Sequence, residues 1–116
     1  MANGQPSAQP TAESVLASLA AAADAARQAY MAALQANPGA DLSQLYAKEM
    51  KAAHVWSDAE AKVLANDPAV AAAQASLDSA TQVIKNELST IKNISTWVTL
   101  IDNLVTLATK VASFFA

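Results

Sequence analysis

The chain has 116 residues, no cysteine and a formal net charge of −3, and 53% of its residues are hydrophobic although only 5% are aromatic. Alanine supplies much of the apolar share, which favours helices in a single domain. The lack of cysteine excludes disulfides, thiol catalysis and thiolate metal sites, and the seven basic residues are too scattered to favour nucleic-acid binding.

The N-terminal segment is polar and contains Pro, Gln and Ser. It has neither the positive charge nor the apolar stretch of a Sec signal peptide. We therefore predict a disordered tail over 1–10 and one helical domain over 11–116. The location stays open between the cytoplasm and export by a leaderless route.

The first predicted helix covers 12–36. Thr11 has the side chain of an N-cap. Apolar residues then recur at alternating spacings of three and four over 16–33, which is the helical pattern. Many of them are alanines, so we expect a neighbouring helix to approach closely. The sequence Asn-Pro-Gly at 37–39 predicts a turn.

The second predicted helix covers 42–65, and Asp41 with Gln44 resembles a capping box before it. Its apolar stripe is interrupted once, by Glu49, and Glu87 interrupts the following stripe in the same way. We expect each to reach solvent at an end of its stripe or to pair with a lysine. A pair of buried carboxylates facing each other is the functional alternative.

The rest of the chain, from Pro68 onward, contains neither glycine nor a further proline. One uninterrupted helix of this length would measure roughly 70 Å, which is too long for a compact monomer. The segment 86–96 is rich in Asn, Ser and Thr, whose side chains compete with helical hydrogen bonds. We therefore predict an all-α, antiparallel bundle of four helices, with three helices and a long C-terminal one as the alternative. The four predicted helices cover 12–36, 42–65, 68–90 and 95–116.

The segment 91–116 is the most amphipathic part of the chain. A second apolar row runs beside its main stripe, so that apolar residues fill half of the helix. This row is the candidate interaction surface for a protein partner or a second copy. A face buried in the bundle core is the default interpretation of this row, and a membrane surface is a further one, but the polar and charged residues of the segment disfavour a membrane span. The row consists of Trp97, Leu100, Leu104, Leu107, Val111 and Phe114.

Other candidates for chemistry are few. His54 is the only histidine, and Asp58 lies one helical turn further on, but a metal site needs more ligands than these two. Trp56 and Trp97 have the size of core anchors, or of binding hot spots if exposed. The sequence thus predicts no catalytic, cofactor or metal site and no small-molecule ligand.

These patterns predict a non-enzymatic interaction or assembly protein that binds a protein partner or itself. The alternative is a membrane-active or exported protein that acts through the amphipathic helix within 91–116.

Overall fold

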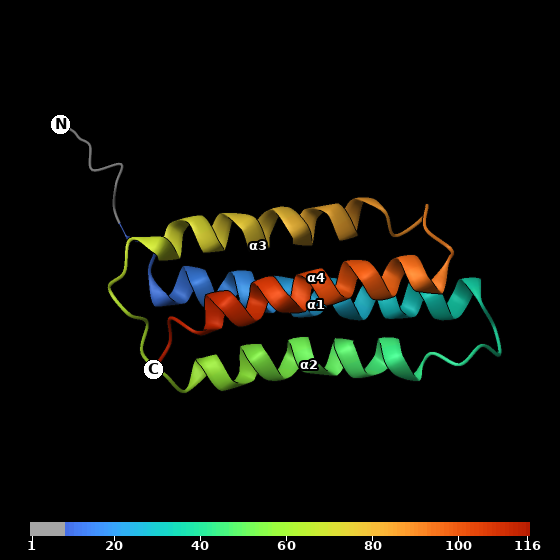
Figure 1. Ribbon diagram of the computed structural model, residues 1–116, viewed down its shortest axis with the longest axis horizontal. Helices are drawn as coiled ribbons and strands as arrows, with labels where there is room; N and C mark the ends of the chain where they lie inside the picture. Colours follow the sequence, from blue (N-terminus) through green and yellow to red (C-terminus); the bar gives the residue numbers. More distant parts are fainter. Residues whose placement is uncertain (1–8) are drawn as a thin grey trace.

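The computed structural model describes residues 9–116 and is a bundle of four helices (Figure 1). The prediction of four helices, with a break after the third, is confirmed. The molecule is long and flat, with extents of 56 × 28 × 16 Å. The helices are α1 (Ala12–Ala36), α2 (Ser43–Glu60), α3 (Ala69–Asn86) and α4 (Ile94–Ala112).

The predicted disordered tail over 1–10 falls mainly on residues 1–8, which lie outside the described part of the chain. Gln9 is described, and its side-chain amide donates a hydrogen bond of 2.8 Å to the backbone carbonyl of Asp67. The segment next to α1 is therefore held against the connection between α2 and α3.

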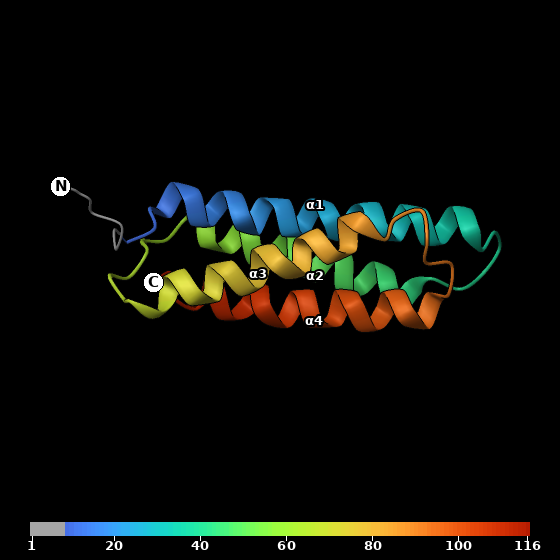
Figure 2. The ribbon, with the colours of Figure 1, turned by 90° about the horizontal axis from the view of Figure 1, so that it is seen from above.

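In Figure 1, α1 and α4 overlap in the middle of the bundle and α2 and α3 lie on its flanks, and Figure 2, turned by 90°, shows α1 and α4 on opposite faces. α1 and α4 each contact all three other helices, whereas α2 and α3 do not contact each other. Consecutive helices run in opposite directions, but α2 and α4 are neighbours that run the same way, as are α1 and α3. The connection from α2 to α3 must consequently cross from one flank to the other.

The helix starts follow the capping signals in the sequence. The side chains of Thr11, Asp67 and Asn93 accept hydrogen bonds from backbone N–H groups two or three residues further on, at 3.0, 2.8 and 2.8 Å. Each bond satisfies one of the N–H groups that a helix start leaves without a partner. In the turn after α1, Gly39 has a φ of 81°, a conformation that favours glycine.

Three helices end earlier than predicted, at 60, 86 and 112 rather than at 65, 90 and 116. The cause at α2 is the crossing to α3, which is extended and pairs with the C-terminal residues. The N–H of Val63 donates to the carbonyl of Ala116 at 3.1 Å, and the N–H of Ala65 donates to that of Phe114 at 2.7 Å. These bonds satisfy backbone groups that a longer helix would have satisfied.

The core combines small side chains from α1 with large ones from α4. The buried face of α1 is mostly alanine, as expected for a helix that lies close to three neighbours. The buried face of α4 carries larger side chains, of which Trp97 is the largest and is completely buried. The buried alanines of α1 are Ala22, Ala25, Ala26, Ala29 and Ala33.

Candidate functional site

The apolar row that the sequence singled out in α4 lies largely inside the bundle. Trp97, Leu104 and Val111 are completely buried. The other three members of the row are half-buried and pack against the core. The chain's own helices therefore cover the row, and a partner would reach only its edges. The half-buried members are Leu100, Leu107 and Phe114.

The remaining sequence candidates do not converge on one site. His54 and Asp58 are both exposed on α2, and within residues 9–116 no three His, Asp or Glu side chains gather closely enough to hold a metal ion. Glu49 lies in the middle of α2, and Glu87 follows the end of α3. Because α2 and α3 do not touch, the two carboxylates do not face each other.

Most of the exposed large apolar side chains belong to α1 and α2. Among residues 9–116, six such side chains are exposed, and four of them belong to these two helices. The ring of Tyr30 on α1 packs against that of Tyr46 on α2, with 5.5 Å between ring centroids and an interplanar angle of 56°. The four exposed side chains are Met31, Leu34, Tyr46 and Met50.

Between these helices lies a hollow of about 390 Å³, which we call the α1–α2 groove. Alanines of both helices leave room for it, and Met50 and Trp56 form larger parts of its wall. Three charged side chains also line it, two acidic and one basic, so its lining carries a net negative charge. Its lining residues are Ala20, Ala23, Asp24, Arg27, Glu49, Met50, Ala53 and Trp56.

Glu49 is the unusual member of the groove. Its side chain is only 7% exposed, and its Oε2 atom is buried without any hydrogen-bond partner. The expectation that it reaches solvent or pairs with a lysine is wrong, because it sits in mid-helix and its cationic neighbour is Arg27. A buried acceptor without a partner costs about 1–3 kcal/mol, and more when it is charged.

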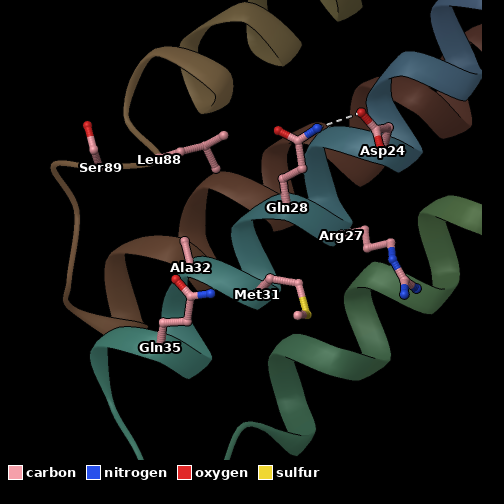
Figure 3. Close-up of a pocket in the computed structure, with 8 residues that line it drawn as sticks. All are labelled: Asp24, Arg27, Gln28, Met31, Ala32, Gln35, Leu88 and Ser89. Carbon is pink, nitrogen blue, oxygen red and sulfur yellow. Dashed lines mark hydrogen bonds between the residues drawn. The ribbon is translucent and has the colours of Figure 1, made fainter.

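Arg27 forms only a weak ion pair with the carboxylate of Glu49. Its Nη1 lies 3.8 Å from Oε1 of Glu49, which is too far for a hydrogen bond, and its side chain is 72% exposed. Figure 3 shows Arg27 directed from α1 toward α2, while the neighbouring Gln28 donates a hydrogen bond of 2.7 Å to Asp24. The guanidinium is therefore free to swing outward at little cost.

A second hollow, of about 490 Å³, lies on the other side of the same strip of α1 (Figure 3). Leu88 and Ser89 of the connection between α3 and α4 border it, together with several polar side chains of α1. Asp24 and Arg27 line both hollows and form the ridge between them. None of the side chains that line this second hollow has a buried polar atom without a partner, so it offers no anchor comparable to Glu49.

One closer ion pair joins α2 to α4. Nζ of Lys48 donates a hydrogen bond of 2.8 Å to Oδ1 of Asp102. This bond and the positive charge of Lys48 hold the pKa of Asp102 below its ordinary value. At the start of α2, hydrogen bonds from Ser43 likewise lower the pKa of Asp41. Both carboxyl groups thus have hydrogen-bond partners within the chain, so we interpret them as structural.

No family model, curated protein or solved structure matches this chain. None of the helices in the described part of the chain is long and apolar enough to cross a membrane. The site therefore has to be judged from its own geometry. The sequence contained one signal for it, the interruption of the second apolar stripe by Glu49, but its position opposite Arg27 depends on how α1 and α2 pack.

Proposed function

We propose that this protein is a non-enzymatic interaction module, and that it binds an apolar helical segment of a partner protein in the α1–α2 groove. The observation that carries the proposal is a hollow between α1 and α2 that Met50 lines, on the two helices that also carry the exposed side chains of Met31, Leu34 and Tyr46. Such a hollow with an apolar lining typically marks a binding surface on a small protein.

The shape of the groove favours a helix as its occupant. Along α2, the side chains of Tyr46, Met50 and Ala53 recur at spacings of four and three, and they offer a row of contacts to a helix laid between α1 and α2. The stretch from Tyr46 to Trp56 spans about 15 Å, or nearly three helical turns. The groove can therefore accept the apolar face of a short helix.

The charge of the groove favours a basic partner. Two carboxylates and one guanidinium line it, and the whole chain has a net charge of −3. Charge complementarity of this kind speeds association and selects among partners. An apolar helix with basic residues is therefore the best match.

The membrane-active alternative is supported less well. It was motivated by the apolar face within 91–116, and the larger side chains of this face pack inside the bundle. A membrane could use that face only after the bundle opens. The α1–α2 groove is available without any such change.

A displayed library of helical peptides tests the proposal. The library is selected on the wild-type protein, and each enriched peptide is then measured on two variants. Ala53→Trp fills the groove. Ala75→Trp, the matched control, places the same side chain at an exposed position of α3. Circular dichroism checks that both variants are folded.

We expect the enriched peptides to bind wild type and Ala75→Trp equally and to bind Ala53→Trp at least about tenfold more weakly, since about 1.4 kcal/mol of lost contact suffices for that change. Peptides that bind both variants alike, or a library that yields no binder, would contradict the proposal. If sedimentation shows that the wild-type protein dimerises and that only Ala53→Trp stays monomeric, the occupant of the groove is a second copy of this chain and not a partner protein.

A further inference from the structure

We infer that Glu49 is the specificity-determining residue of the α1–α2 groove, and that it receives an arginine side chain from the bound helix. This inference rests on the proposed function, because it names the group that the groove selects. It is carried by a separate observation, the Oε2 atom of Glu49, which is buried and has no hydrogen-bond partner.

The position of Glu49 has no structural explanation within the bundle. Its side chain is 93% buried, since 7% is exposed, and most of the other side chains that line the groove are apolar. Burying a carboxylate is unfavourable unless it is paired and hydrogen-bonded. The described residues supply one cation near it, and that cation does not reach hydrogen-bond distance. A ligand cation would complete the pairing that the fold leaves unfinished.

Access to Glu49 depends on Arg27. Its guanidinium lies on the solvent side of the carboxylate and is mostly exposed. When it swings outward, water hydrates it without loss, and a second guanidinium can take its place over Glu49. Arg27 therefore competes with the ligand for the same carboxylate, which makes its removal a direct test.

The walls of the groove fit a guanidinium better than an ammonium group. A guanidinium is flat, is more weakly hydrated than an ammonium group and packs its face on aromatic side chains. Trp56 and Met50 line the same hollow as Glu49. An ammonium group, in contrast, is a compact and strongly hydrated charge, so it loses more hydration on entering this hollow.

Two small probes measure this preference without a known partner. Hexylguanidinium carries the charged group on an apolar stem, and hexylurea is its neutral counterpart of similar size and shape. Each is titrated into the full chain, and NMR follows the methyl groups of Met50 and Ala53 and the indole of Trp56. The readout is the ratio of the two dissociation constants.

We expect hexylguanidinium to bind wild type at least about tenfold more tightly than hexylurea, because both can donate N–H groups to the carboxylate but only the guanidinium adds a positive charge that forms an ion pair with it. Glu49→Gln, which keeps the shape of the side chain, should reduce the ratio to about one. The matched control Glu87→Gln should leave it unchanged. Arg27→Ala should tighten hexylguanidinium a few-fold, an increase that a merely structural role for Glu49 would not produce.

Each other outcome is decisive. If both probes bind the groove equally, the groove binds apolar groups and Glu49 does not select among them, so the inference fails while the proposed function stands. If the preference for hexylguanidinium survives in Glu49→Gln, another carboxylate is responsible and the inference fails. If neither probe moves the groove signals, the inference and the proposed function both fail.

Discussion

Two surfaces of this protein, the apolar row of α4 and the α1–α2 groove, differ in what they face. The apolar row of α4 is the stronger pattern, yet its central members are completely buried. The α1–α2 groove is assembled from two helices with weaker patterns, and these helices carry exposed Met, Leu and Tyr side chains, of which Met50 lines the groove. A pronounced amphipathic pattern thus marks the helix that the core needs most, while the open surface lies where two less regular helices meet.

The largest expected effect comes from placing a charge on each surface. Ile101 in α4 is completely buried, so Ile101→Asp should leave the chain unfolded at 25 °C, because an unpaired buried charge costs several kcal/mol of a typical stability of about 5–15 kcal/mol. Met50→Asp, on the groove edge, should lower the free energy of unfolding by about 1 kcal/mol or less. Circular dichroism during urea titration measures both, and a native-like Ile101→Asp would overturn this contrast.

Truncating a leucine on each surface sharpens the same contrast. Leu104→Ala should lower the free energy of unfolding by about 2–5 kcal/mol, because it opens a cavity in the core. Leu34→Ala should lower it by about 1 kcal/mol or less, since Leu34 is an exposed residue of α1, one of the two helices that form the groove. Equal losses in urea denaturation would mean that the two surfaces are equally packed.

Removing the buried carboxylate should not harm the fold. Glu49→Met fills a similar volume without a charge to desolvate, so the free energy of unfolding should stay the same or rise by about 1 kcal/mol. The comparison variant Glu87→Met, at the end of α3, should change it by less than about 0.5 kcal/mol. A loss of more than about 2 kcal/mol on Glu49→Met would instead assign Glu49 a structural role.

The smallest effect concerns the ion pair between α2 and α4. The pKa of Asp102 is lowered in the folded state, so its contribution is present above the unfolded-state pKa and is lost as the pH falls through the folded-state pKa. Lys48→Met removes the cause, and stability measured between about pH 5 and pH 2 should fall less steeply than in wild type. An unchanged slope would show that Lys48 does not hold this carboxylate.

The bundle was predictable because the residues that start and end its helices act on their immediate neighbours in the sequence. Thr11 marks a helix start by its own side-chain chemistry, and the Asn, Ser and Thr residues of 86–96 mark the break before α4. The early end of α2 was not predictable, because it follows from the crossing between flanks and from the pairing of Val63 with Ala116. Such long-range bonds leave no pattern in the sequence.

The candidate site was predictable only in part. The sequence marked Glu49 as an interruption and Trp56 as a large side chain, but it could not show that Glu49 faces Arg27 across two helices. The apolar row of α4 was recognised as amphipathic, although amphipathicity alone does not tell whether a face meets the core or a partner. That distinction depends on how the other three helices surround α4.

The central claim, that binding occurs in the α1–α2 groove and not on the row of α4, is tested most directly by a methyl NMR map of the wild-type chain with a display-selected peptide. We predict that signals of Ala23, Met50 and Ala53 shift as the peptide is added, while those of Leu104 and Val111 stay in place. Shifts centred on Leu100 and Leu107, with the groove signals unchanged, would contradict it.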